Sequence, residues 1–316
     1  EIRKQRMEKI EELKKEGIDV YGRAFPKKEI AFIKEGETDV RTAGRIMAIR
    51  HHGGSSFLDI KDSTGKIQIY FKKNAVSEKE LFIFKRLDIG DIIGVEGDVF
   101  RTKTGELTIF VKHLTLLSKA LNPLPEKWHG LKDVEIRFRK RYLDLIMNED
   151  VRDVFSRRIK ILQYIREFLN SKGFIEVDTP MMHPIPGGAE ARPFITYHNA
   201  LEMNLYLRIA PELYLKRLLV GNFEKIYEIN RCFRNEGISP LHNPEFTMLE
   251  LYSAYGDCHE MMEITESLIT FLTEKVNNSL ILDYQDKKID LSLPWKRIKW
   301  ADVFLEAGIS DWRDKK

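Results

Sequence analysis

Two predicted strands in the stretch 223–252 bring an arginine, an aromatic ring, a carboxylate and a phenol to one surface. Side chains alternate along the first strand, predicted over 225–234, and Arg234 ends its more polar face. The return strand, predicted over 245–252, places one set of side chains on a single face: Phe246, Met248, Glu250 and Tyr252. A cation, a stacking ring and an acid on adjacent strands suit a ligand that is part nucleotide and part amine.

The whole run is more specific than any of its residues. Taken singly, each is explained equally well by a hairpin with one surface arginine and ordinary core aromatics. The continuous run FRNEGISPLHNPEFTMLELY, residues 233–252, is similar to the second signature motif of class II aminoacyl-tRNA synthetases. It has the form found in the lysyl-tRNA synthetase family, and Phe233–Glu236 matches the FRxE core.

The resemblance implies a two-step ligase reaction. The carboxylate of L-lysine attacks the α-phosphate of ATP, which gives lysyl-adenylate and pyrophosphate, and the 3′ end of tRNA(Lys) then takes the lysyl group. Arg234 is the expected catalytic residue, because its planar fork can bridge the substrate carboxylate and the α-phosphate. The expected ATP-binding residues are Arg234, Glu236, His242, Asn243 and Phe246. The alternative for His242 is a plain loop histidine.

Two earlier segments complete the expected lysine site. Pro186–Ala189 contains two glycines, which allow close backbone approach to a ligand or simply make a turn. In the run RIAPELYLK, Glu212 lies in the first turn of a predicted helix, where the helix dipole alone would favour a carboxylate. The resemblance makes Glu212 the partner of the substrate α-ammonium. The lysine-binding residues expected from the family are Gly188, Glu212, Arg234, Glu250 and Tyr252.

Composition fits a soluble globular protein and excludes several other classes. The chain has 316 residues, 32% of them charged, and its net charge of +3 is too small to indicate a nucleic-acid binder by itself. Two cysteines give neither a disulfide framework nor metal-ligand spacing, which favours a reducing, cytoplasmic setting. No apolar run is long enough to span a membrane.

The first part of the chain is predicted to be an OB-fold barrel over 40–118. Five short strands separated by Gly-containing turns, with one helix after the third, have the order of this fold, which often binds single-stranded nucleic acid. An N-terminal helical arm, 1–39, precedes the barrel and is either solvated or helps to hold tRNA. The family resemblance assigns anticodon binding to Phe57, Gln68 and Glu106, although Phe57 could pack in the core and Glu106 could belong to a turn.

A linker, 119–133, is predicted to lead into a class II catalytic domain built on an antiparallel sheet, 134–316, so the fold class is α+β. The basic run that opens this domain reads as a solvated face. An amphipathic helix over 150–172, followed by a strand and Pro180, resembles the first class II motif, which implies a homodimer through 150–180. The alternative is one more helix packed on a sheet.

The third class II motif, a Gly-rich strand and helix ending in Arg, is absent. After Gly256 the only glycine is Gly308, so we expect the catalytic domain to be truncated before this motif. The carboxylates that would hold Mg²⁺ are expected in the missing part, and no metal ligands are predicted in this segment. Two alternatives to lysine–tRNA ligase stay open at this point: an aspartyl- or asparaginyl-tRNA synthetase, and a non-catalytic RNA-binding paralogue.

Overall fold

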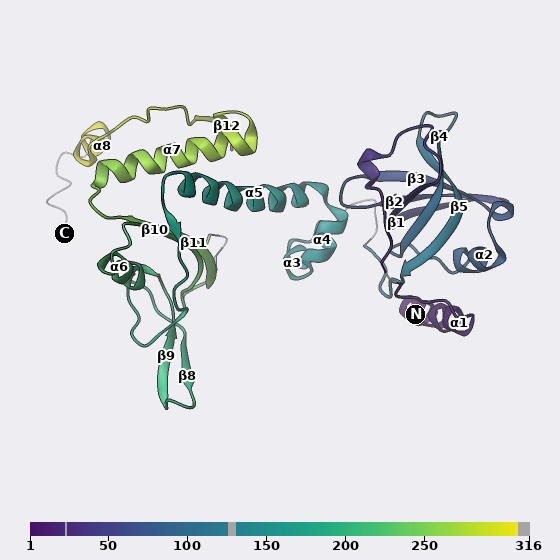
Figure 1. The fold of residues 1–316 in the computed structure, drawn as a ribbon, viewed down its shortest axis with the longest axis horizontal. Coiled ribbons are helices and arrows are strands. Elements are labelled where there is room, and N and C mark those ends of the chain that lie inside the picture. The colour runs from purple at the N-terminus through teal and green to yellow at the C-terminus, as the bar shows by residue number, and fades with distance from the viewer. Residues whose placement is uncertain (23, 126–130, 240, 309–316) are drawn as a thin grey trace. The chain divides into compact units, whose positions relative to one another are not determined.

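The computed structural model describes residues 1–316 apart from 23, 126–130, 240 and 309–316 (Figure 1). The chain divides into two compact units, Glu1–Glu149 and Asp150–Lys316. Part of the predicted linker, 126–130, lies outside the described residues. Within the described part, no helix is both long enough and apolar enough to cross a membrane.

The first unit contains a closed five-stranded barrel, which confirms the predicted OB-fold. Its strands neighbour one another in the order β1-β2-β3-β5-β4, with β3 and β5 parallel and the other pairs antiparallel. Helix α2 (Glu78–Phe84) follows the third strand, as predicted. The strands are β1 (Val40–His52), β2 (Ser55–Lys61), β3 (Lys66–Lys72), β4 (Ile92–Arg101) and β5 (Leu107–Ser118).

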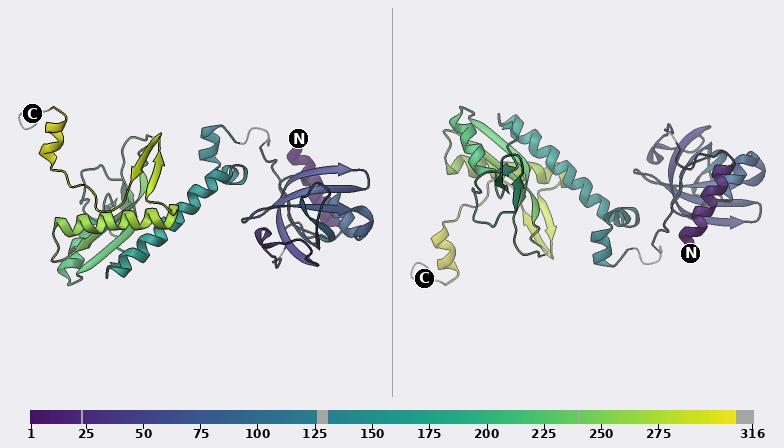
Figure 2. Two further views of the ribbon diagram at one scale, coloured as in Figure 1. Left: turned by 90° about the horizontal axis from the view of Figure 1, so that it is seen from above. Right: turned by 90° about the horizontal axis from the view of Figure 1, so that it is seen from below.

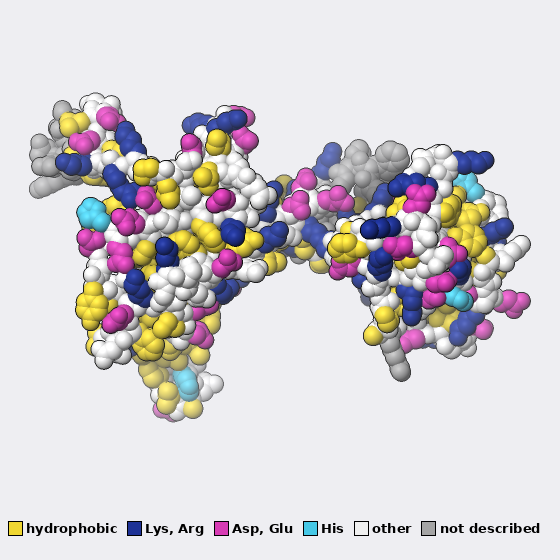
Figure 3. Space-filling model, turned by 45° about the horizontal axis from the view of Figure 1, so that its top comes forward, with side chains coloured by type: hydrophobic (Ala, Val, Ile, Leu, Met, Phe, Trp, Pro, Cys, Tyr) yellow, Lys and Arg dark blue, Asp and Glu magenta, His cyan; other side chains and the backbone are white. Residues whose placement is uncertain are grey.

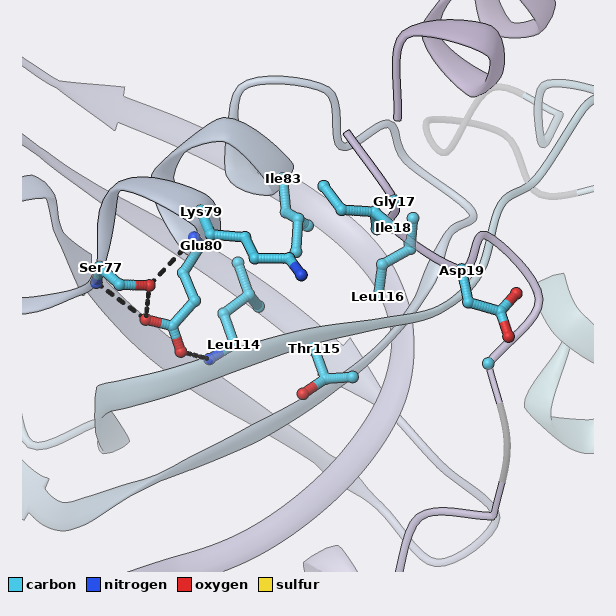
Figure 4. A pocket seen from close by; sticks show the side chains of 11 residues that line it. Gly17, Ile18, Asp19, Ser77, Lys79, Glu80, Ile83, Leu114, Thr115 and Leu116 are labelled. Atoms are coloured by element: carbon cyan, nitrogen blue, oxygen red, sulfur yellow. Dashed lines mark hydrogen bonds between the residues drawn. The ribbon is translucent and has the colours of Figure 1, made fainter. Parts of the chain in front are cut away.

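Alternating side chains explain why these strands close. Leu58, Ile60, Ile67, Ile69 and Ile109 are almost completely buried and fill the barrel, while their strand neighbours face outward. Helix α2 begins with a capping box. The Ser77 hydroxyl accepts from the Glu80 amide, and the Glu80 carboxylate accepts from the Ser77 amide (Figure 4). The same figure shows a hollow beside α2, and none of the predicted site residues lines it.

The N-terminal helix is attached to the barrel. Ile10 and Leu13 of α1 (Ile2–Lys15) belong to the barrel core. Arg6 is buried, and its guanidinium donates to the backbone carbonyls of Ile89, Ala120 and Asn122. The interpretation of this helix as a solvated arm is therefore wrong, because its apolar stripe completes a core. Met7, at the edge of that stripe, is exposed.

The basic run after the linker forms two short helices, α3 (Val134–Arg139) and α4 (Arg141–Met147). Asp144 is fully buried and pairs with Arg137, at 2.9 Å, and with Arg141. The prediction of a purely solvated face is thus wrong for these two arginines. Contacts group both helices with the first unit, although the catalytic domain was predicted to begin at 134. Two 3-10 turns complete this unit, η1 (Ile30–Phe32) and η2 (Lys73–Ala75).

The second unit is organised around a three-stranded sheet in the order β11-β10-β6. Strands β10 (Lys225–Phe233) and β11 (Glu245–Ser253) are antiparallel, and the short β6 (Ile175–Glu176) pairs with β10 in parallel. Helices α5 (Glu149–Ser171) and α7 (Cys258–Asn277) cover one face of this sheet (Figures 1 and 2). Their contact with the sheet buries Ile165, Phe168, Leu169, Tyr227, Ile264 and Leu268.

Helix α5 is amphipathic as predicted, but its apolar stripe is buried over only part of its length. Ile165, Phe168 and Leu169 lie in the core, whereas Val154 and Ile159, nearer the start of the helix, are more than half exposed. Nothing in the described part of the second unit covers this earlier portion. The helix therefore carries an apolar surface that a helix packed on a sheet along its whole length would bury.

A second three-stranded sheet, β7-β9-β8, adjoins the other face. It consists of β7 (Met182–His183), β8 (Ile195–His198) and β9 (Met203–Leu207), and the β8–β9 hairpin projects with apolar side chains on its surface (Figures 1 and 3). Helix α6 (Glu212–Val220) follows at once. The remaining elements are β12 (Ile281–Tyr284), β13 (Lys287–Asp290) and α8 (Trp300–Glu306).

Candidate functional site

The register of β10 and β11 brings the predicted site residues to one face. Cys232 is paired with Phe246, Glu228 with Glu250, and Ile226 with Tyr252. Residues directly opposite each other in an antiparallel pair point to the same side of the sheet. The alternation predicted from the sequence is confirmed, and this face lies away from α5 and α7.

Arg234 stands at the end of β10, over Phe246 of the neighbouring strand. Its guanidinium carbon is 5.1 Å from the centroid of the ring, within the range of a cation–π contact. Its backbone amide donates to the carbonyl of Pro244 at 2.8 Å, which fixes the base of the side chain. Its Nε is buried and has no hydrogen-bond partner among the described residues. A buried donor without a partner is costly, so this atom is suited to an acceptor on a ligand.

A cavity of about 220 Å³ opens beside Arg234. Five of its lining residues are the whole predicted ATP-binding set: Arg234, Glu236, His242, Asn243 and Phe246. His242 is exposed, and its Nδ1 lies 2.8 Å from the Ser239 hydroxyl. That contact holds the ring within its own loop, so the plain-loop interpretation of His242 stays as open as the ATP-binding one.

Further along the same face, the site is acidic. The Tyr252 hydroxyl donates to the Glu250 carboxylate at 3.0 Å. Burial raises the pKa of Glu250; the Tyr252 hydrogen bond opposes this effect, and the nearby carboxylate of Glu212 adds to it. Burial also raises the pKa of Tyr252, and the Glu250 carboxylate raises it further. A cation placed between Glu212 and Glu250 would favour the ionised carboxylates and so oppose the rise in the pKa of Glu250.

Gly188 approaches Glu212 so closely that no larger residue fits. A Cβ at position 188 would lie 2.8 Å from the Cβ of Glu212 and 3.2 Å from that of Ala210. Its φ of +88° also lies in the region that favours glycine. The simple-turn interpretation explains the φ but not the close approach. The structure therefore places Gly188 against Glu212, and the charge of Glu212 acts on Glu250.

A buried ion pair beneath this face was not predicted. Arg208 donates to Glu228 at 2.6 Å, and both side chains are at most 3% exposed. Arg208 also donates to the carbonyls of Arg231 and Thr179, and the Thr179 hydroxyl donates to Glu228. The signal in the sequence was Glu228 itself, an acid in the middle of an otherwise buried strand. Its partner, Arg208, directly follows β9 and could not be identified from the alternation.

Cys232 shares this face but is not a nucleophile. Burial raises the pKa of its thiol to about 11, so the thiolate form is scarce at neutral pH. Both cysteines, Cys232 and Cys258, are free. Among the described residues, no group of three or more His, Cys, Asp or Glu side chains could hold a metal ion.

Of the three residues predicted for anticodon binding, Phe57 and Gln68 lie on the neighbouring strands β2 and β3, and Glu106 directly precedes β5. Gln68 Nε2 donates to the Glu106 carboxylate at 3.0 Å, and the Thr108 hydroxyl donates to Gln68 Oε1. Phe57 is half-buried outside the barrel core, with its ring centroid 4.9 Å from that of Tyr70. The core-packing interpretation of Phe57 is therefore not supported. Glu106 also satisfies its turn interpretation, because its amide donates to Thr102 Oγ1.

Comparison with known families identifies the two domains of the chain. Residues 133–315 match the family of tRNA synthetases class II (D, K and N), and residues 40–117 match the OB-fold nucleic acid binding domain. The first match covers more than half of the chain. The chain therefore belongs to the class II tRNA synthetases of this group.

Within that class, the relatives are lysine–tRNA ligases. The chain is 59% identical over 313 residues to the lysine–tRNA ligase of Carboxydothermus hydrogenoformans and 51% identical over 319 residues to that of Thermotoga maritima. Each alignment covers 97% of this chain and 64% of the relative. The lysine–tRNA ligase of Syntrophomonas wolfei is 54% identical, with 98% and 64% covered. The chain thus spans less than two thirds of the length of these curated relatives.

Proposed function

We propose that this chain is the barrel and most of the catalytic domain of a lysine–tRNA ligase, which activates L-lysine with ATP and transfers it to the 3′ end of tRNA(Lys). The proposal is supported by the family, by the names of the relatives, and by a site with one face for a nucleotide and an acidic end for an amine. The observation that carries it is the buried, unpartnered Nε of Arg234 above the ring of Phe246.

Arg234 would stabilise charge at the reacting phosphate. Attack of the lysine carboxylate on the α-phosphate concentrates negative charge between the two groups, and a guanidinium can donate to both at once. Phe246 would stack on adenine from the opposite strand, while Glu236, His242 and Asn243 would orient the nucleotide from the loop that lines the cavity. No covalent enzyme intermediate is required, so catalysis would come from positioning and electrostatics.

The acidic end would select the amino acid. Glu212 would receive the α-ammonium of lysine beside the close backbone approach at Gly188, and Glu250 with Tyr252 would face the side-chain ammonium. Two carboxylates in a half-buried pocket favour a substrate with two ammonium groups over a dicarboxylic substrate, because an anionic side chain would add to their repulsion. This argues against aspartate, and asparagine would leave Glu250 without a counter-charge.

The barrel would read the anticodon through its outer face. Phe57 and Tyr70 offer aromatic rings for stacking, and Gln68 and Glu106 offer donors and acceptors to base edges. Gln68 and Glu106 are already hydrogen-bonded to each other, so their remaining polar atoms are held in a fixed direction. Such preorganisation lowers the entropic cost of binding a single-stranded loop.

Two further features belong to the proposal. The exposed apolar side chains near the start of α5 would pack against a second copy, so the enzyme would be a homodimer through 150–180. Sedimentation of the full-length protein as a monomer at micromolar concentration would contradict this. Mg²⁺ would bind together with ATP. The reaction belongs to protein synthesis in the cytoplasm.

The second candidate function is a non-catalytic RNA-binding paralogue. It predicts no use of the Arg234 cavity. An aspartyl- or asparaginyl-tRNA synthetase is a weaker alternative because of the acidic pocket. ATP–pyrophosphate exchange measured in turn with lysine, aspartate and asparagine separates all three, because exchange requires ATP and the matching amino acid to bind at the proposed site.

The test compares Arg234→Ala with Arg231→Ala in the full-length protein. Arg231 is three residues earlier, is exposed, and lies on the opposite face of β10. We expect exchange to be lost in Arg234→Ala and retained in Arg231→Ala. Exchange that persists in Arg234→Ala would refute the role of this guanidinium. A wild-type protein that binds tRNA but catalyses no exchange with lysine, aspartate or asparagine would favour the paralogue.

A further inference from the structure

Lys216 places an ammonium group directly on the carboxylate that is proposed to receive the substrate α-ammonium. Both residues lie on α6, one turn apart, and the Nζ of Lys216 is 2.6 Å from Oε1 of Glu212. The Lys216 side chain is 57% exposed and that of Glu212 is 31% exposed. The pair therefore sits at the mouth of the site, with the cation on the solvent side.

The surroundings show that this pair faces the acidic pocket. Helix α6 packs against β10 and β11, and Glu212 touches the backbone at Gly188. The ammonium of Lys216 also acts on Glu250, lowering its pKa against the larger effect of burial. The neighbouring cation, Arg217, is engaged elsewhere, with its guanidinium carbon 4.7 Å from the centroid of the Tyr214 ring.

We infer that Lys216 is a resident counter-ion of the lysine site, which holds Glu212 until the α-ammonium of the substrate displaces it. The inference rests on the proposed function and deepens it. Half-buried carboxylates without a cation are unfavourable, because desolvation is not offset by attraction. A lysine on a flexible four-carbon stem is suited to the role, because it can pair in the empty site and return to water when the substrate binds.

The consequence is that substrate binding exchanges one ammonium for another. The new ion pair forms only after the Lys216–Glu212 pair breaks. Breaking that pair costs free energy, which makes the net binding of L-lysine weaker. Removing the ammonium at 216 should tighten binding of L-lysine, which is the opposite of what loss of a binding residue does. An ordinary surface pair at this helical spacing would leave the affinity unchanged.

The experiment measures the Kd of L-lysine for the full-length protein by titration calorimetry, in wild type and in three variants. Lys216→Gln removes the ammonium, Lys216→Arg keeps a cation at the position, and Arg217→Gln removes the adjacent cation that does not face Glu212. We expect Lys216→Gln to bind L-lysine about 1.5- to 5-fold more tightly, the range of a partly exposed ion pair. Lys216→Arg and Arg217→Gln should bind as wild type does.

A second readout follows the lysine itself. Acetylation of Lys216 by a water-soluble acyl ester is quantified by mass spectrometry relative to that of the exposed Lys103 of the barrel, because free L-lysine also consumes the ester. This relative rate should become faster when L-lysine is added, because displacement frees the amine of Lys216. Unchanged or weaker binding in Lys216→Gln would overturn the inference alone, as would equal tightening in Arg217→Gln, which would indicate only a general charge effect. Slower acetylation with L-lysine would also overturn it. Failure of the wild type to bind L-lysine at all would overturn the proposed function as well.

Discussion

The buried pair of Arg208 and Glu228 is expected to control the stability of the unit that carries the site. Arg208 is 3% exposed, and besides Glu228 it holds the carbonyls of Thr179 and Arg231, so it joins three segments. Arg208→Met removes the cation and leaves the Glu228 carboxylate buried with only Thr179 as its partner. Breaking one side of such a pair costs about 3–5 kcal/mol.

The size of the effect can be separated from simple loss of contacts by a double-mutant cycle. Replacing both members by apolar residues, Arg208→Met with Glu228→Met, removes the uncompensated charge and should cost much less than the single change, because apolar replacements of buried pairs are often close to neutral. The exposed pair of Arg166 and Glu176 in the same unit is the matched control. It has three contacts of 2.9–3.1 Å, yet its side chains are 43% and 36% exposed, so Arg166→Met should cost at most about 1 kcal/mol.

Urea unfolding followed by tryptophan emission provides the assay. Among the described residues, two tryptophans lie in the second unit, Trp295 and Trp300, and the barrel strands contain none. The signal therefore reports mainly on the unit that contains the pair. A loss below about 1 kcal/mol in Arg208→Met, or equal losses in Arg208→Met and Arg166→Met, would refute the argument that burial makes the first pair critical.

Two other predictions follow from the two sites. Glu250→Gln should stabilise the protein at neutral pH, because the folded state raises the pKa of Glu250 above its ordinary value of 4.5, so the stability of the wild type falls as pH rises through that raised pKa. The melting temperatures of wild type and variant should therefore converge below pH 4.5. A difference in melting temperature that is constant with pH would contradict this prediction. Phe57→Ala should weaken binding of an anticodon stem-loop about 5- to 150-fold, the range for one base stacked on a ring. Phe32→Ala, which changes an exposed ring of the same unit away from the strands that carry Phe57, is the control, and equal losses in filter binding would count against stacking on Phe57.

The sequence by itself determined the order of elements and one face of the site. The alternation in 225–234 and 245–252 was enough to place Arg234, Phe246, Glu250 and Tyr252 on one side of a sheet, because the side-chain period of a strand is fixed. The five barrel strands and the capping box at Ser77 were likewise visible, since turns, caps and alternation are local signals.

Only the tertiary structure decided which distant residues meet. Arg208, which directly follows β9, pairs with Glu228 of β10, and Lys216 reaches the acidic pocket because α6 packs against β10 and β11. The burial of Ile10 and Leu13 against the barrel, which contradicted the interpretation of a solvated arm, likewise depends on residues distant in the sequence. Local propensity and periodicity act over a few residues, whereas ion pairing and burial depend on groups that the chain brings together from far apart, so the sequence pattern alone does not contain them.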